Sequence, residues 1–555
     1  MELAANFGEL RPDHWHMGLD IRTKQKENFP VYAAAGGFIS KIRIEKFGYG
    51  RSIYINHPNG LTTVYGHLNN FFPALEKYIT EQQYKKESWE IELNFTKNQF
   101  PVFKSQFIAF SGNTGSSQGP HLHFEIRNTK TSKCLNPLLF GFPLQDNVPP
   151  EIIRLAMYDR SRSVYEQSPQ LFSLQKTNNG YIIPGVPVIQ TGLKKISFAI
   201  QAYDKMSQSK SPDGIYTAKI YFDNRPVSGF VLDSIDYDET VYMNAQIDYK
   251  LRYNDGIYFQ HLSQLPGDHG VVYKKTRGDG LINLADTGFH LIHIEAKDAY
   301  FNTSQLNFMI QYNDSIAQPF FADTSQQKFI PNQVNILEKQ DFELYMPENC
   351  LYDSIQSIYN RNDLNVPNAV SALHQVNDPS IPLHNDISIR ILPIKEIPAE
   401  WKNKIIIKRT DPRSNTIRRA EWQNSWLSAK FGDFGNFQAF VDTIAPEIKI
   451  SGSGDTLDFR PDTSIVIESR DNNGPVKKFR AEIDNHWIRF TNDKGSPYIY
   501  NFDEHCPEGV HQLKVTVEDW VGNSTTKSWW FKRYPYIPPQ KKIIHRKKQA
   551  LRNRQ

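Results

Sequence analysis

The strongest constraint on the fold is a pattern that the chain contains twice, more than 200 residues apart. In both copies a glycine is followed by a histidine two residues later, an aspartate ten residues later and an asparagine fourteen residues later. The copies are Gly288, His290, Asp298 and Asn302, and Gly509, His511, Asp519 and Asn523. Between glycine and aspartate, apolar residues alternate with the period of a β-strand. The repeat predicts one β-sandwich module present twice, at about residues 146–315 and 442–533.

A proline-containing linker precedes each copy, at residues 147–152 and 442–448. Proline disfavours helical backbone in the residue before it, so each module is expected to begin as an extended strand. Two interpretations of the Asp and Asn pairs stay open: calcium binding at a domain junction, or hydrogen-bonded turns, which are the commoner role of these residues. Residues 316–441 lie between the copies and have a β-rich pattern in which the turn signals between strands are weaker.

The N-terminal part also has the pattern of short strands separated by turns. Pro58-Asn59-Gly60 lies between two apolar runs, which is a strong hairpin signal. Residues 61–65 are therefore expected to run antiparallel to residues 52–55 and to place His67 at their end. Residues 69–100 interrupt this pattern, because Pro73 begins a predicted helix and the alternation over 89–95 predicts a half-buried strand.

Composition excludes several classes of protein. The 555 residues suffice for three to five domains, and no stretch approaches the ~18 apolar residues of a membrane-spanning helix. The net charge is +4, but residues 541–555 carry seven Lys or Arg and no acid, so the rest sums to −3 (4 − 7). The body thus lacks the basic face of a nucleic-acid binder. The basic tail is expected to be a solvated end; the alternative is attraction to an anionic polymer or membrane surface.

Cysteine usage argues against a thiol-based framework. Cys134, Cys350 and Cys506 are more than 150 residues apart and no CxxC occurs, so neither a disulfide scaffold nor a thiolate zinc site is expected. The sequence MELAANFGEL at the N-terminus has neither the basic region nor the apolar core of a signal peptide.

Histidines gather in a way that indicates a metal site. His14 and His16 precede Asp20, His67 follows a predicted strand, and His121 and His123 lie in the segment GPHLHFE. Strand periodicity places His121, His123 and Glu125 on one face. Imidazole and carboxylate are suitable zinc ligands, and three of them leave a fourth position open for water, whose pKa zinc lowers to about 7.

Two residues of this group have open interpretations. His14 is expected at the surface, with a contact to the groove as the alternative. Glu125 either orients an imidazole or is a surface charge at the end of a strand.

Three segments of this group resemble the motifs of the lysostaphin/LytM-type zinc endopeptidases. They are RPDHWHMGLD at 11–20, YGHL at 65–68 and SGNTGSSQGPHLHFE at 111–125, in the order of that family, and the resemblance covers about residues 5–140. It implies that His16, Asp20 and His123 bind one Zn²⁺ per chain. It also implies that His67 and His121 act on the water or the tetrahedral intermediate. The implied reaction is cleavage of peptide bonds in peptidoglycan cross-links or stem peptides.

The predicted fold class is mainly β. An antiparallel peptidase domain at 1–145, with an insertion at 69–100, precedes β-rich modules at 146–315, 316–441 and 442–533 and a basic tail at 534–555. Two or three of these modules are expected to be immunoglobulin-like sandwiches. We hypothesise that the insertion walls the substrate groove and narrows substrate choice; the alternative is an insertion without such a role.

The expected place of action is the cell envelope, although no signal peptide is visible at the N-terminus. The expected partners are peptidoglycan peptides and, through the β modules, an envelope protein. The alternative function is a non-catalytic wall-binding or regulatory protein on the same fold that activates other wall hydrolases.

Overall fold

The structure is a computed structural model that describes residues 2–206, 211–274, 278–316, 327–363, 366–450, 456–459, 463–495 and 497–534. The basic run at 541–555 lies outside the described residues. We define four parts: the N-terminal domain (2–145), the first sandwich (146–315), the middle sandwich (327–441) and the C-terminal sandwich (442–533). Strands dominate all four parts, as the sequence predicts.

The N-terminal domain is built around one twisted antiparallel sheet. Its elements are β1 (Leu3–Ala5), β2 (Leu19–Arg22), β3 (Pro30–Tyr32), β4 (Gly37–Ile44), β5 (Arg51–Asn56), β6 (Leu61–Gly66), β7 (Leu68–Phe71), α1 (Pro73–Lys86), β8 (Ile91–Asn94), β9 (Pro101–Val102), β10 (Phe107–Ser111), β11 (His121–Asn128), β12 (Cys134–Leu135) and the 3₁₀ helix η1 (Pro137–Phe140). The main sheet runs β1-β2-β11-β6-β5-β4-β8, and β3, β10 and β7 form a second, small sheet.

The predicted hairpin is confirmed. β5 and β6 pair antiparallel across the turn at Pro58–Gly60, with Ile53 opposite Tyr65. Tyr65 is buried in the core of the domain together with Ile53 and Leu75. β6 therefore ends beside β11, where Gly66 is paired with His123, and His67 follows directly after it.

The insertion at 69–100 folds as predicted, into α1 and the edge strand β8. β8 pairs with β4 at the opposite end of the sheet from β2, and Leu75 and Ile79 bury one side of α1 in the domain core. The exposed side of α1 contacts the C-terminal sandwich, as described below. A role of the insertion in walling the substrate groove and narrowing substrate choice stays a prediction.

The first sandwich packs a five-stranded sheet (β14-β13-β18-β22, with β23) against a seven-stranded one (β15-β16-β25-β24-β19-β20, with β17). Its elements are β13 (Glu151–Asp159), η2 (Val164–Glu166), β14 (Gln170–Ser173), β15 (Gln175–Thr177), β16 (Gly180–Ile182), β17 (Val188–Thr191), β18 (Lys195–Tyr203), β19 (Thr217–Phe222), β20 (Arg225–Val231), β21 (Ser234–Ile235), η3 (Tyr237–Tyr242), α2 (Met243–Gln246), α3 (Tyr249–Asp255), β22 (Gln260–His261), β23 (Ile282–Asn283), β24 (Phe289–Lys297), β25 (Thr303–Tyr312) and η4 (Asp314–Ile316).

The middle sandwich has two five-stranded sheets, β27-β28-β32-β36-β35 and β30-β31-β37-β33-β34, and a short pair, β26 with β29. Its elements are β26 (Lys328–Phe329), β27 (Asn335–Glu338), β28 (Phe342–Met346), β29 (Ile355–Gln356), β30 (Tyr359–Asn362), β31 (Leu373–Val376), β32 (Pro382–Ile391), η5 (Ala399–Trp401), β33 (Ile405–Thr410), β34 (Asn415–Arg419), β35 (Glu421–Gln423), β36 (Trp426–Asp433) and β37 (Gly435–Val441).

The C-terminal sandwich packs β38-β40-β43 against β39-β45-β44-β41-β42. Its elements are β38 (Glu447–Ile450), β39 (Thr456–Asp458), β40 (Ser464–Arg470), β41 (Lys478–Ile483), β42 (His486–Trp487), η6 (Asp493–Gly495), β43 (Tyr498–Asn501), β44 (Gly509–Glu518) and β45 (Ser524–Arg533).

The internal repeat has the same structure in both copies. The repeated residues lie on the hairpins β24/β25 and β44/β45. In each, the asparagine amide donates to the aspartate carboxylate at 2.7 Å, in Asn302–Asp298 and in Asn523–Asp519. The prediction of hydrogen-bonded turns is therefore confirmed for both pairs.

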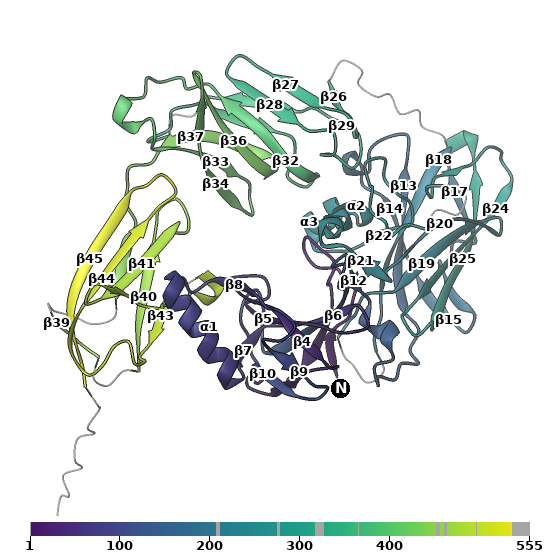
Figure 1. Ribbon diagram of the computed structural model, residues 1–555. Helices are drawn as coiled ribbons and strands as arrows, with labels where there is room; N and C mark the ends of the chain where they lie inside the picture. The colour runs from purple at the N-terminus through teal and green to yellow at the C-terminus, as the bar shows by residue number, and fades with distance from the viewer. Residues whose placement is uncertain are drawn as a thin grey trace, which may run out of the picture.

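The four parts close into a ring (Figure 1), in which the C-terminal sandwich lies beside α1 of the N-terminal domain. On the other side, β12 pairs with β21 of the first sandwich, and Phe7, Trp15 and Met17 share a buried cluster with that sandwich. The first and middle sandwiches also share a buried cluster. No helix among the described residues is both long and apolar enough to cross a bilayer.

The ring is closed by Tyr84 on α1. Its ring stacks on His505 with centroids 3.6 Å apart, and its hydroxyl donates to Oδ2 of Asp503 at 3.0 Å. Glu87 and Gln83 of the same turn region bond Arg480 and Arg489. Since a hydrogen bond to a charged group contributes about 1.5–3 kcal/mol, Tyr84 adds such a bond to its stacked ring and is one of the anchors of this contact.

Tyr84→Ala is expected to release the C-terminal sandwich from α1, because it removes both the stacked ring and the hydrogen bond to Asp503. Small-angle X-ray scattering should then show a larger radius of gyration and maximum dimension than for the wild type. Glu81→Ala, at an exposed position of the same helix, is the matched control and should leave the curve unchanged. An unchanged curve for Tyr84→Ala would contradict the role of this anchor.

Candidate metal centre

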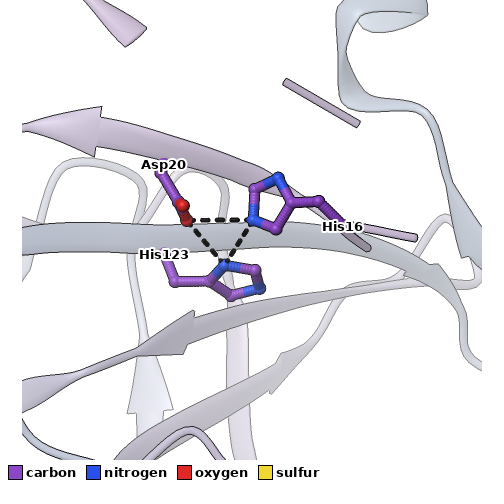
Figure 2. A group of neighbouring side chains, drawn as sticks. All are labelled: His16, Asp20 and His123. Atoms are coloured by element: carbon purple, nitrogen blue, oxygen red, sulfur yellow. Dashed lines mark hydrogen bonds and ion pairs between the residues drawn. The ribbon is translucent and has the colours of Figure 1, made fainter. Parts of the chain in front are cut away.

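The structure brings His16, Asp20 and His123 together from two neighbouring strands. Asp20 lies on β2 directly opposite His123 on β11, and His16 lies in the loop that leads into β2. Directly opposite residues of an antiparallel pair have Cβ atoms about 4.5–5.5 Å apart, so the register of this pair alone makes the two side chains neighbours. Figure 2 shows the three side chains pointing toward one another.

The three candidate ligand atoms form a compact triangle. Oδ1 of Asp20 lies 3.0 Å from Nε2 of His16 and 2.9 Å from Nδ1 of His123. The two nitrogens are 3.1 Å apart, and all three residues are buried. Because zinc binds nitrogen and oxygen ligands at about 2.0–2.2 Å, a single ion can contact all three atoms.

The outer partners of the two imidazoles direct their lone pairs into this triangle. Nδ1 of His16 is 2.7 Å from the carbonyl oxygen of Asn6, and Nε2 of His123 is 2.9 Å from Oε1 of Glu125. Both acceptors require an N–H on the outer nitrogen, which leaves the inner nitrogen free to bind a metal when the ring is neutral. Oδ2 of Asp20 accepts from Arg11 at 3.0 Å, so the other oxygen, Oδ1, faces the histidines. The residues present therefore fit a divalent ion.

Burial and charge set the protonation of these groups. Burial alone would raise the pKa of Asp20, but His16, His121 and His123 hold it well below its usual range. Burial lowers the pKa of His16. For His123 the effect of burial is outweighed by the carboxylates of Asp20 and Glu125, which raise its pKa to about 9. Without a cation, the imidazole of His123 thus supplies the positive charge between two buried acids.

Glu125 is fully buried, so the surface-charge interpretation of this residue is wrong. Besides His123, its carboxylate accepts from Arg127 at 2.6 Å and from the hydroxyl of Tyr49. Burial would raise its pKa, but Arg127 and His123 lower it, so it stays ionised. An ionised carboxylate behind His123 orients the ring and increases the basicity of its free nitrogen.

His67 and His121 lie side by side next to the triangle, with ring centroids 4.8 Å apart. Nδ1 of His67 is 2.7 Å from the carbonyl oxygen of Thr114, and Nδ1 of His121 is 2.8 Å from that of Gly119. Nε2 of His121 is 3.3 Å from Oδ1 of Asp20. Burial lowers the pKa of His67 to about 3, so its imidazole is neutral at ordinary pH.

The loop that orients these two histidines is held by the C-terminal sandwich. The backbone N–H of Gly115 donates to Oδ1 of Asp493 at 2.7 Å, and the ammonium of Lys494 donates to the carbonyl oxygen of Ser117 at 2.7 Å. The first sandwich reaches the same region through Tyr237, whose hydroxyl lies 3.3 Å from Oε1 of Glu125. Both sandwiches of the repeat therefore contact residues that surround the candidate metal centre.

Several of these contributors are not recognisable in the sequence. The carbonyl groups of Asn6, Thr114 and Gly119 act through the main chain, so no side-chain motif marks them. Tyr237 and Asp493 belong to distant parts of the chain. His14, in contrast, is exposed and bonds the adjacent Asp13, which confirms the predicted surface position.

Comparison with known families agrees with this geometry. Residues 14–84 match the family described as Peptidase family M23. The N-terminal domain belongs to this peptidase family. Residues 326–442 match a different family, described as a Zu5-like domain. The immunoglobulin-like character expected of the sandwiches stays a prediction.

The relatives are similar to about a quarter of this chain. The chain is 32% identical over 136 residues to an uncharacterized metalloprotease of Haemophilus influenzae, covering 24% of this chain and 22% of the relative. It is 33% identical over 128 residues to a DD-carboxypeptidase/endopeptidase of Neisseria meningitidis, covering 23% of each. The chain thus spans less than a quarter of the length of these relatives. The catalytic domain of lysostaphin from Staphylococcus simulans aligns with 25% of this chain and 90% of its own, at 22% identity and a TM-score of 0.19.

Gly18→Ala is expected to weaken metal binding at least about fivefold. A Cβ at position 18 would lie 2.4 Å from the carbonyl oxygen of Phe124 and 3.0 Å from Cε1 of His123, so β2 and β11 must separate where Asp20 and His123 face each other. Overpacking of this kind costs about 1–3 kcal/mol. Zinc affinity is measured by competition with a chromogenic chelator.

Gly36→Ala is the matched control for this test, because its Cβ would meet no heavy atom closer than 3.7 Å. This variant should bind zinc like the wild type. Equal affinity in Gly18→Ala would show that close approach of the two strands is not needed for the site.

Proposed function

We propose that this protein is a zinc-dependent endopeptidase that hydrolyses peptide bonds in peptidoglycan cross-links or stem peptides. The observation that carries the proposal is the convergence of three buried donor atoms, from His16, Asp20 and His123, with outer partners that free the inner lone pairs. Two imidazoles and one carboxylate form a three-ligand set that leaves one position open, as in catalytic rather than structural zinc sites. Membership of the N-terminal domain in Peptidase family M23 supports the same reaction class.

In this proposal His16, Asp20 and His123 hold one zinc ion per chain. The ion would supply a Lewis acid that acidifies a water molecule and polarises the scissile carbonyl. Glu125 holds His123 in the tautomer that binds through Nδ1. Arg11 balances part of the charge of Asp20 and leaves only one carboxylate oxygen facing the site.

His67 and His121 carry the proton transfers in the proposed mechanism. The carbonyl groups of Thr114 and Gly119 hold the N–H of each ring on Nδ1, so Nε2 is the nitrogen that can accept a proton. A neutral His67, with its pKa lowered to about 3 by burial, is a poor base, and its unprotonated Nε2 can accept a hydrogen bond from the attacking water. His121, beside Asp20, is therefore the better placed general base.

The substrate class and the place of action belong to the same proposal. Two relatives, in Haemophilus and Neisseria, are named as a metalloprotease and a DD-carboxypeptidase/endopeptidase, and their names agree with hydrolysis of a peptide bond. Peptidoglycan lies in the cell envelope, so we place the activity there. An envelope protein as a partner of the sandwiches remains part of the proposal, since the ring leaves outer faces on all three of them.

The decisive experiment is mass analysis of the fragments that the zinc-loaded protein releases from purified peptidoglycan, with and without a chelator. We expect new peptide ends that disappear when the metal is removed. Binding to the wall without release of any fragment, with zinc present, would instead support the non-catalytic regulatory protein.

Two substitutions separate metal binding from turnover. His123→Ala should lose both zinc and activity, whereas His121→Ala should keep most of the zinc and lose about 10²–10⁴-fold in kcat, the usual contribution of a general acid or base. Zinc content is measured by mass spectrometry and kcat on a cross-linked peptide substrate. His14→Ala, exposed and outside the site, should behave like the wild type. Full activity in His121→Ala would remove the role assigned to this residue.

A further inference from the structure

A second group of buried acids lies where the N-terminal domain joins the first sandwich. Asp146 is in the linker, Asp204 follows β18 and Asp298 follows β24. Each offers one carboxylate oxygen, and these oxygens lie within 4.8 Å of one another. The side chains are enclosed, since the three residues are 7%, 2% and 1% exposed.

Asp204 has an unsatisfied carboxylate oxygen in the described part of the chain. Oδ1 of Asp204 is buried and has no hydrogen-bond partner among the described residues. A buried charged oxygen without a partner is costly, and a nearby cation would remove that cost. Asp298 is held in place by its own turn, because Tyr300 N–H and Asn302 N–H both donate to its Oδ1.

Two members of the group, Asp204 and Asp298, have raised pKa values. Burial and the negative charges of Asp298 and Asp146 raise the pKa of Asp204 to about 8. Burial raises the pKa of Asp298 as well, and Asp146 adds to the shift. Asp213 is paired with Asp204 by two backbone hydrogen bonds. Burial raises the pKa of Asp213 to about 6, and the charge of Asp146 adds to the shift. The carboxylates repel one another, so a cation bound between them would be favoured.

We propose that Asp146, Asp204 and Asp298 bind a calcium ion at the junction of the N-terminal domain and the first sandwich. All the donors are oxygens, which suit a hard cation, and the set contains neither the nitrogen nor the sulfur that zinc prefers. Three carboxylates favour calcium over magnesium, because magnesium keeps several waters and usually takes one or two carboxylates. The site is separate from the candidate zinc centre and does not depend on the proposed reaction.

The C-terminal sandwich provides an internal comparison. The register of β38 and β40 places Asp471 where β13 and β18 place Asp204. Asp442 and Asp519 correspond to Asp146 and Asp298: the amide of Asn523 donates to the carbonyl of Asp442 at 3.0 Å, and that of Asn302 donates to the carbonyl of Asp146 at 3.1 Å.

The two sets of acids differ in the charge beside them. Burial lowers the pKa of Lys408, and Asp442 and Asp471 partly oppose this shift. Oδ1 of Asp471, like that of Asp204, has no hydrogen-bond partner among the described residues. Unlike the first set, this second set is not among the close groups of potential ligands found in the described residues. The second junction thus differs from the first in the wider spacing of its acids and in the positive charge of Lys408, which interacts with two of them.

A cation at this position would stabilise the junction next to the candidate zinc centre. Asp204 and Asp213 pair through their backbones, and the neighbouring Gly214 exchanges two hydrogen bonds with the side chain of Asn6, at 2.8 and 2.9 Å. The carbonyl of Asn6 is the acceptor for His16. Asp204, Asp213, Gly214 and Asn6 therefore connect the two sites through bonded groups.

The test is a calcium titration of the full-length protein after saturation with zinc, so that the zinc centre is filled. Isothermal titration calorimetry should find one calcium per chain in the wild type, and a saturating concentration should raise the Tm by about 5 °C. Asp204→Asn should weaken calcium binding at least tenfold and abolish the rise in Tm. Asp471→Asn, at the equivalent position beside Lys408, is the matched control and should keep both.

A second measurement separates a cation site from a purely structural cluster. Without calcium, Asp204→Asn should melt above the wild type, because it removes one of the repelling charges; a structural role would make it melt below. If Asp204→Asn does not fold, Asp146→Asn takes its place in the same titration. The proposal is overturned if the wild type does not bind calcium, if Asp204→Asn binds it equally well, or if Asp471→Asn removes the binding.

Discussion

The antiparallel pairing of β2 with β11 is the interaction on which the candidate metal centre depends. It places Asp20 directly opposite His123, although the two residues are separated by 103 positions in the chain. A shift of the register by one residue would turn one of the side chains to the other face of the sheet. Gly18 allows the two strands to approach closely at this point, since any side chain there would meet the backbone of β11.

Around this pair, the structure compensates each buried charge with a group of opposite sign. Arg11 balances Asp20, and Arg127 balances Glu125, so two acids can remain ionised beside the histidines. In the low dielectric of a buried site, an unpaired charge costs free energy. A charge with a partner of opposite sign is stabilised and held in one orientation. The group at Asp146, Asp204 and Asp298 lacks such a partner among the described residues for one of its oxygens.

The ring of sandwiches places parts of the chain that are distant in sequence next to the site. Asp493 and Lys494 of the C-terminal sandwich hold the loop whose carbonyls orient His67 and His121. Tyr237 of the first sandwich contacts Glu125. The first and C-terminal sandwiches therefore contact residues around the metal centre. The C-terminal sandwich is also attached to the N-terminal domain through α1. The insertion at 69–100 has a structural purpose in this arrangement, because it supplies the surface on which the ring closes.

Much of this protein follows from local sequence. The Asn-Gly turn, the proline-led linkers and the repeated Gly, Asp and Asn positions determine strands and hairpins, because turn chemistry and strand period act over a few residues. The same is true of His121, His123 and Glu125, which a single strand aligns. The convergence of His16, Asp20 and His123, the burial of Glu125 and the closure of the ring were decided by tertiary structure. They depend on strand register and on contacts between distant parts of the chain, which turn chemistry and strand period do not encode. For His16, Asp20 and His123 only the resemblance of three motifs to a known family implied that they meet.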